Sequence, residues 1–158
     1  MMTSKFLVGD TLPDFDLETP DGGRTGRSDF AGKKLVLFFY PKDNTPGCTT
    51  EAKDFSALKP AFDKAGVALL GISKDSPKKH QNFIAKHDLT TPLASDAEEG
   101  GLSDELGIWT EKQNYGRTYM GMVRTTYLVG ADGKIARVWD KVRVKGHAED
   151  VLAAAQAL

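Results

Sequence analysis

The sequence has very little cysteine: Cys48 is its only one among 158 residues. A single cysteine excludes an internal disulfide, so the fold is not held by oxidative cross-links. A free thiol is also easier to keep in a reducing compartment, which makes the cytoplasm the expected location. The thiol of Cys48 is therefore either inert packing or a reactive group.

Long apolar runs and an excess of either charge are missing too. The densest apolar run, residues 35–40, is far too short to span a bilayer, and the first five residues contain no apolar signal core. Lys and Arg number 21 against 22 acidic residues, a formal net charge of -1, so no net basic field is available to attract phosphate groups. These absences argue against nucleic-acid and membrane partners.

Length and composition favour one compact domain. With 40% hydrophobic and 27% charged residues, a chain of 158 residues forms a core large enough to fold without staples. The sequence contains no internal repeat, low-complexity tract or linker between domains. We expect a single domain that spans residues 1–158.

The hydrophobic pattern of the first half predicts alternating strands and helices. An apolar run that ends at Pro41 is typical of a strand buried on both faces, and Ser76 with the following proline is a typical helix cap. The predicted elements are a strand at 34–40, a helix from Thr49 to Gly66, a strand at 67–72 and a helix from Pro77 towards His87. This βαβα alternation indicates a parallel sheet.

The pattern also predicts a hairpin near the N-terminus, and a second hairpin followed by a helix near the C-terminus. Residues 11–17 alternate in polarity and lead into a glycine-containing turn at 19–23, which predicts an N-terminal β-hairpin. After a loop-rich middle, the pattern predicts a strand at 124–129, a turn at 131–133, a strand at 135–139 and a helix at 147–158. This order predicts an α/β, thioredoxin-like fold with a mixed central sheet flanked by helices.

The strand-to-helix turn around the cysteine carries the most specific signal. Cys48 is expected in the first helical turn, where unpaired amides and the positive end of the helix dipole favour an anion. Thr45 lies three residues earlier, a spacing that can bring its hydroxyl back towards the cysteine and the first amides. Pro41 ends the strand without a backbone donor, and we expect it to shield a thiolate from water.

A fixed cation for this turn has to come from elsewhere in the chain. Arg124 begins a predicted strand, and its guanidinium stays charged and offers several donors in a planar fork. Glu51, one helical turn after Cys48, is placed to orient that guanidinium. From the residues alone, Arg124 is equally well explained as a surface side chain and Glu51 as an acid that complements the helix dipole. A further signal is needed to choose between these explanations and a role in the site.

That signal is a family resemblance. The spacing Pro41-x-x-x-Thr45-x-x-Cys48 with a distant arginine resembles the active-site pattern of peroxiredoxins. Five more segments look like the bacterioferritin-comigratory, or Q, subfamily: residues 8–15, 71–76, 91–96, 124–128 and 145–147. The resemblance spans nearly the whole chain.

The resemblance implies a thioredoxin-like fold and reduction of hydrogen peroxide and organic hydroperoxides. It makes Cys48 the attacking thiolate, with Pro41, Thr45 and Arg124 completing the site and Glu51 in support. The chemistry requires no metal or organic cofactor. A monomer or a small homodimer is the expected assembly.

Ionisation of a thiol is not enough for fast peroxide reduction. A thiol whose pKa falls from ~8.5 to ~6 gains ~30-fold in thiolate at neutral pH. It loses on the order of tenfold in intrinsic nucleophilicity, because nucleophilicity falls with basicity. The site must therefore also polarise the O–O bond and stabilise charge on the leaving oxygen.

The sequence departs from the subfamily at the second cysteine. Many members carry a resolving cysteine five residues after the first or on the following helix, whereas Lys53 and Ile84 occupy those places here. We therefore expect a one-cysteine cycle, in which Cys48 sulfenic acid waits for an external thiol such as thioredoxin, glutaredoxin or glutathione.

Two other functions stay open from the sequence. A thiol-disulfide oxidoreductase is compatible with the fold, although no Cys-x-x-Cys pair is present. A non-catalytic redox sensor or holdase that uses slow Cys48 oxidation to change a binding surface is the other.

Histidines and aromatic residues give weaker signals. The three histidines have no metal-ligand spacing, and His80 and His87 are expected on a solvated helix face. Trp109, Tyr115 and Tyr119 are expected on a loop that packs onto the domain.

Overall fold

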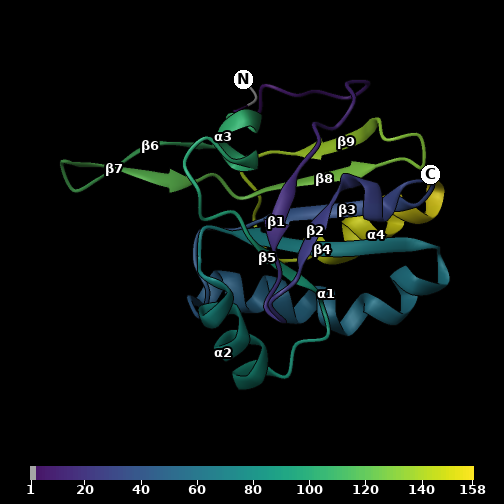
Figure 1. Cartoon of the computed structure of the whole chain (residues 1–158), viewed down its shortest axis with the longest axis horizontal. Helices are drawn as coiled ribbons and strands as arrows, with labels where there is room; N and C mark the ends of the chain where they lie inside the picture. Colours follow the sequence, from purple (N-terminus) through teal and green to yellow (C-terminus); the bar gives the residue numbers. More distant parts are fainter. Residues whose placement is uncertain (1–2) are drawn as a thin grey trace.

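The computed structural model describes residues 3–158 and contains the predicted strands and helices in their predicted order, with further elements between them (Figure 1). The strands are β1 Asp16–Glu18, β2 Arg24–Gly26, β3 Lys34–Phe39, β4 Val67–Ser73, β5 Leu93–Ser95, β6 Trp109–Asn114, β7 Arg117–Met122, β8 Thr125–Val129 and β9 Ile135–Trp139. The helices are the 3-10 helix η1 Arg27–Phe30 and the α-helices α1 Pro46–Lys64, α2 Pro77–His87, α3 Leu102–Leu106 and α4 His147–Ala157.

Seven strands form one mixed sheet in the order β2-β1-β5-β4-β3-β8-β9. Strand β3 runs parallel to β4 and antiparallel to β8, and β4 runs parallel to β5. The predicted α/β, thioredoxin-like fold with an N-terminal hairpin is therefore confirmed. Among residues 3–158, no helix is both long and apolar enough to cross a membrane.

Strand β3 contributes to two cores, one on each face of the sheet. Leu35, Leu37 and Phe39 join the cluster beneath α3 and the N-terminal segment, whereas Val36 and Phe38 join the cluster beneath the helices α1, α2 and α4. Successive side chains of a strand point to opposite faces, so an uninterrupted apolar run is what burial on both faces requires. Cys48 belongs to the helix-covered cluster.

Helix α1 begins three residues before the predicted start because Pro46 fits its first turn. The helix also contains Pro60, which lacks the N–H that would bond the carbonyl of Ser56. The hydroxyl of Thr90 donates to that carbonyl at 3.2 Å and so replaces the missing bond. Gly66, with a φ of 74°, ends the helix as predicted.

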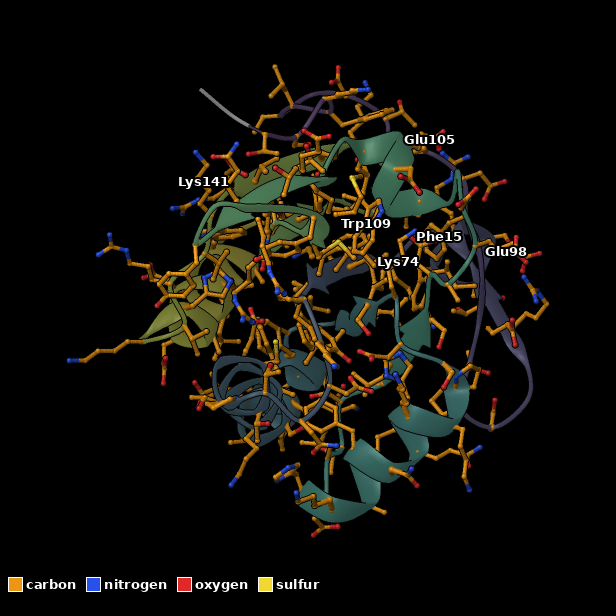
Figure 2. All side chains as sticks on the ribbon, turned by 90° about the vertical axis from the view of Figure 1, so that its left-hand side faces the viewer. Phe15, Lys74, Glu98, Glu105, Trp109 and Lys141 are labelled. Atoms are coloured by element: carbon orange, nitrogen blue, oxygen red, sulfur yellow. The ribbon has the colours of Figure 1, made fainter. Side chains whose placement is uncertain are left out.

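The middle of the chain is more ordered than predicted. It contains β5, α3 and a β6–β7 hairpin that extends away from the sheet (Figure 1). Tyr115 and Gly116 turn this hairpin with φ values of 50° and 75°, the signs of a two-residue hairpin turn. The expected packed aromatic loop is wrong for Tyr115, which is 99% exposed. At the base, Lys74 lies over the Trp109 ring, 5.2 Å from its centroid (Figure 2).

The N-terminal hairpin exists but is shorter and starts later than predicted. Its strands pair Asp16 with Gly26 and Glu18 with Arg24. The preceding stretch pairs instead with the β8–β9 turn, where the Leu12 amide donates to the Gly133 carbonyl at 2.9 Å. The alternating pattern predicted an extended segment there, but such a pattern does not show which strand or turn the backbone pairs with.

Candidate active site

Helix α1 places the only cysteine in its first turn. Thr45 is the N-cap, and Pro46, Gly47 and Cys48 are the first three helical residues. The first amides of a helix have no partner within it, and they point towards the N-terminal end. Cys48 is 1% exposed, so its sulfur lies in the core at the positive end of the helix dipole.

Arg124 joins Cys48 to Glu51 through the two arms of its guanidinium. Its Nη2 lies 3.3 Å from the Cys48 sulfur, and its Nη1 donates to Glu51 Oε1 at 2.7 Å. Arg124 stands between β7 and β8, 76 residues from Cys48 in the sequence. Strand pairing between β3 and β8 thus brings the predicted cation to the helix that follows β3.

Gly47 makes room for this guanidinium. A Cβ at Gly47 would lie 3.2 Å from Arg124 Nη2, which is tighter than ordinary van der Waals contact. The glycine therefore allows a close approach at this position, whereas its φ imposes no special demand.

Glu51 is a buried carboxyl with only one oxygen in a hydrogen bond. Burial raises its pKa to about 7, although the charge and hydrogen bond of Arg124 lower it. Its second oxygen, Oε2, is buried without a hydrogen-bond partner and lies 4.0 Å from His147 Nε2. His147 Nε2 also lies 2.8 Å from the hydroxyl oxygen of Thr126.

His147 is the residue of this cluster that the sequence left without a role. It begins α4, at the far end of the chain, and only the family-like segment 145–147 drew attention to it. Burial lowers the pKa of His147 to about 4, partly opposed by Asp150, so the imidazole is neutral at physiological pH.

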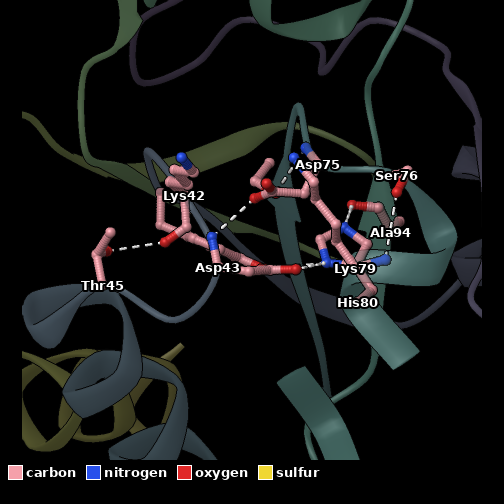
Figure 3. A network of polar contacts seen from close by, with 10 residues as sticks. Lys42, Asp43, Thr45, Asp75, Ser76, Lys79, His80 and Ala94 are labelled. Atoms are coloured by element: carbon pink, nitrogen blue, oxygen red, sulfur yellow. Dashed lines mark hydrogen bonds and ion pairs between the residues drawn. The ribbon is translucent and has the colours of Figure 1, made fainter. Parts of the chain in front are cut away.

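Thr45 and Pro41 lie on the loop that leads into the helix of Cys48, but their side chains have other neighbours. The Thr45 hydroxyl donates to the Lys42 carbonyl at 2.8 Å, so this N-cap residue makes no side-chain hydrogen bond to the helix amides (Figure 3). Pro41 is half-buried and follows Tyr40, whose side chain is in the core. Among residues 3–158, no side-chain hydrogen bond joins Thr45 to Cys48, in contrast to the expected approach of its hydroxyl.

A second buried polar cluster fastens this loop to helix α2 (Figure 3). His80 Nδ1 lies 2.7 Å from Asp43 Oδ2, and the Tyr40 hydroxyl donates to Asp43 Oδ1 at 2.6 Å. The Asp43 amide donates to Asp75 Oδ2 at 2.8 Å. The expected solvated position is therefore wrong for His80, which is fully buried, because its helix turns this residue towards the sheet.

Known proteins resemble this chain in sequence and fold. The sequence pattern of the AhpC/TSA family matches residues 8–138. Peroxiredoxin Bcp of Xanthomonas campestris is 47% identical over 144 residues, covering 91% of this chain and 89% of the relative, and that of Bacillus subtilis is 41% identical over 145 residues, covering 92% of each. A solved structure of the X. campestris bacterioferritin comigratory protein, described with its alkyl peroxide reduction activity, superposes with a TM-score of 0.87 at 44% identity and 98% coverage of both chains.

The matched pattern, the curated relatives and the buried cysteine–arginine pair agree. The chain belongs to the AhpC/TSA family of peroxiredoxins. Within that family its relatives are the Bcp, or PrxQ, proteins.

Proposed function

We propose that this chain is a one-cysteine, thiol-dependent peroxidase that reduces hydrogen peroxide and alkyl hydroperoxides. The observation that carries the proposal is the 3.3 Å contact between Arg124 Nη2 and the Cys48 sulfur at a helix N-terminus. A guanidinium at this distance stabilises a thiolate and also offers N–H donors to a bound peroxide. The alkyl peroxide reduction described for the X. campestris relative supports this choice of substrate.

In the reaction, the Cys48 thiolate attacks the terminal oxygen of the hydroperoxide. An S–O bond forms as the O–O bond breaks, so sulfur is oxidised by two electrons and the other oxygen leaves as alkoxide or hydroxide, which takes up a proton. Arg124 and the free first-turn amides of α1 are the donors that face the developing negative charge. Such donors act most strongly in a buried site, where little water competes.

Thr45 and Pro41 complete the proposed site. The Thr45 hydroxyl can accept and donate at once, so it exchanges its bond to the Lys42 carbonyl for one to the bound peroxide. Pro41, half-buried at the end of β3, excludes water without adding a backbone donor. Glu51 holds the Arg124 fork in the orientation that leaves Nη2 free for sulfur and substrate.

Regeneration requires an external thiol because Cys48 is the only cysteine. The thiol attacks the sulfenic acid, releases water and forms a mixed disulfide, and a second thiol then restores Cys48. Cys48 is 1% exposed, so the first turn of α1 or the loop before it must open for this attack. We propose that a monomer or small homodimer suffices for the cycle.

Stopped-flow kinetics test this function directly. Reduced protein is mixed with hydrogen peroxide or an alkyl hydroperoxide, and mass spectrometry then locates sulfenic acid on Cys48. The expected result is fast formation of one sulfenic acid per chain, absent in Cys48→Ser, followed by turnover with an added thiol. Slow oxidation that changes binding to a partner would favour the redox sensor instead, and disulfide reduction without peroxide turnover would favour the oxidoreductase.

A further inference from the structure

The arrangement around Glu51 leaves one cation to serve two acidic groups. Arg124 donates one arm to Glu51 and the other to Cys48, at 2.7 Å and 3.3 Å. If both acids were ionised, Arg124 would be the only cation among residues 3–158 in hydrogen-bond contact with them, since Lys112 acts on Cys48 without a hydrogen bond to it. Burying an unbalanced charge is costly, so one of the two acids should hold a proton while the other is ionised.

Glu51 has an oxygen available for that proton. Its Oε1 accepts from Arg124, whereas Oε2 is buried and has no hydrogen-bond partner. Glu51 as a whole is 1% exposed, so water does not satisfy this oxygen from the surface. Burial raises the pKa of Glu51 to about 7, which makes the protonated form accessible near neutral pH.

His147 faces this oxygen as a neutral acceptor. Its Nε2 lies 4.0 Å from Oε2, and a shift of about 1 Å would bring the two atoms to hydrogen-bond distance. Edge-on contacts from Phe55 and Trp139 hold the imidazole in this place. We interpret the 2.8 Å contact with Thr126 as the alternative partner of Nε2 when Glu51 is ionised.

We propose that Glu51, with His147 as its positioning residue, is the proton reservoir of the peroxidase site. The carboxyl holds a proton on Oε2 while Cys48 is a thiolate and releases it when the sulfur is oxidised. This inference rests on the proposed peroxidase function and adds the source of the proton that the reaction consumes.

The balance of the step follows from the charges. A thiolate, a protonated Glu51 and a hydroperoxide become a neutral sulfenic acid, an ionised Glu51 and an alcohol. The sulfur loses its negative charge, so Arg124 is left to balance the carboxylate alone. The proton that Glu51 releases compensates for the one that the leaving alkoxide takes up, and no further reactant is needed.

Other charged groups around the pair act on both members. Asp54 raises the pKa of Glu51, which favours storage of the proton. Around His147, Asp150 raises the pKa, whereas Arg124 and Arg137 lower it together with burial. The imidazole therefore stays neutral and acts as an acceptor rather than as a second cation.

Proton uptake during peroxide reduction distinguishes a reservoir from a purely structural pair. A thiolate with no internal proton source takes up one proton from solvent for each sulfenic acid formed, and a neutral thiol takes up none. Uptake is followed by stopped flow with a pH-indicator dye in weak buffer near neutral pH. It is compared with the thiolate fraction of the same variant, measured by ultraviolet absorbance, and with sulfenic acid counted by mass spectrometry.

The expected result is that wild-type uptake falls below the thiolate fraction, whereas in Glu51→Gln the two are equal. His147→Leu should move uptake towards the thiolate fraction, and His147→Gln, which keeps a polar acceptor, should restore the deficit. Equal uptake and thiolate fraction in the wild type would overturn the reservoir, and an undiminished deficit in His147→Leu would overturn the role of His147. If no sulfenic acid forms at all, the peroxidase function itself fails.

Discussion

His80 Nδ1 lies 2.7 Å from Asp43 Oδ2 with both side chains buried, and this pair connects helix α2 to the loop that carries Thr45. His80 Nε2 lies 3.0 Å from the carbonyl oxygen of Ala94, which can only accept, so that nitrogen carries a proton. Asp43 also accepts from the Tyr40 hydroxyl at 2.6 Å. One carboxyl therefore satisfies two buried side chains and fixes where the loop leaves the sheet.

Removing this carboxyl should loosen the loop before Cys48. Asp43→Ala leaves the Tyr40 hydroxyl and His80 Nδ1 with only their long mutual contact of 3.4 Å, and we expect a loss of about 3 kcal/mol in the free energy of unfolding. Asp43→Asn keeps an acceptor for Tyr40 and a donor for a neutral His80, so its loss should be about 1 kcal/mol. Urea unfolding measures both values.

The same two variants report on loop dynamics. Hydrogen exchange of the amides at residues 42–45 should be faster in Asp43→Ala than in Asp43→Asn, because local opening is easier where buried contacts are lost. Unchanged exchange in Asp43→Ala would show that the pair does not fasten the loop.

Glu51 and His147 should give opposite pH dependences of stability. Burial raises the pKa of Glu51 from 4.5 to about 7, so the folded protein keeps a proton that the unfolded chain has lost, and stability falls as pH rises across that window. Burial lowers the pKa of His147 from 6.5 to about 4, so stability falls as pH drops across its window. Between pH 4.5 and 6.5 the two effects largely cancel.

Single substitutions should separate the two contributions to the pH dependence of the free energy of unfolding. In Glu51→Gln only His147 remains, so the free energy of unfolding should increase with pH by up to about 1.4 kcal/mol per unit between pH 4.5 and 6.5. In His147→Gln only Glu51 remains, and the free energy should decrease over the same range. Urea unfolding at a series of pH values measures both slopes, and slopes of the same sign in the two variants would refute this assignment.

Much of the fold was predictable from the sequence, because local rules decide it. The run 34–40 reads as a doubly buried strand, and Ser76 caps α2 by accepting from the Lys79 amide at 3.2 Å. The β6–β7 hairpin was missed because its strands carry polar side chains on an arm with little core contact, so no apolar period marks them. These two strands are held by hydrogen bonds to each other, which the hydrophobic pattern does not reveal.

The site was predictable only where a motif fixes the spacing. Cys48 and Thr45 lie within one turn, and the family resemblance singled out Arg124, which pairing of β3 with β8 brings to the cysteine. His147 reaches Glu51 only because α4 packs on α1, a tertiary contact that leaves no local pattern. The burial of His80 depends likewise on where α2 docks against the sheet.

Thr45 is expected to contribute its hydroxyl to the reaction. Thr45→Val should lower the second-order rate constant for peroxide on the order of 10²-fold, since it removes one donor from the site. The unfolding free energy should change by only about 1 kcal/mol, because one bond to the Lys42 carbonyl is lost. Thr45→Ser keeps the hydroxyl, so its rate constant should stay close to that of the wild type. Equal rate constants for Thr45→Val and Thr45→Ser would contradict a role of the hydroxyl in the reaction.

Gly47 is expected to be required for the position of Arg124. In Gly47→Ala the new methyl group lies 3.2 Å from Nη2, so the guanidinium must shift by a few tenths of an ångström from its place beside the sulfur. We expect the peroxide rate constant to fall on the order of tenfold, equivalent to ~1.4 kcal/mol. Thr50→Ala, on the exposed side of the same helix turn, is the matched control and should react as fast as wild type. Stopped flow that finds Gly47→Ala equally fast would contradict the close-approach argument.

The most direct measurement is the peroxide rate constant of Arg124→Met divided by its thiolate fraction, each determined at the same pH, with Arg124→Lys as the charge-retaining control. If Arg124 polarises the bond being broken, this normalised rate constant falls on the order of 10²-fold or more in Arg124→Met, and Arg124→Lys recovers only part of it because it lacks the planar fork. A normalised rate constant that equals that of the wild type would mean that Arg124 acts on ionisation alone, and it would contradict the account.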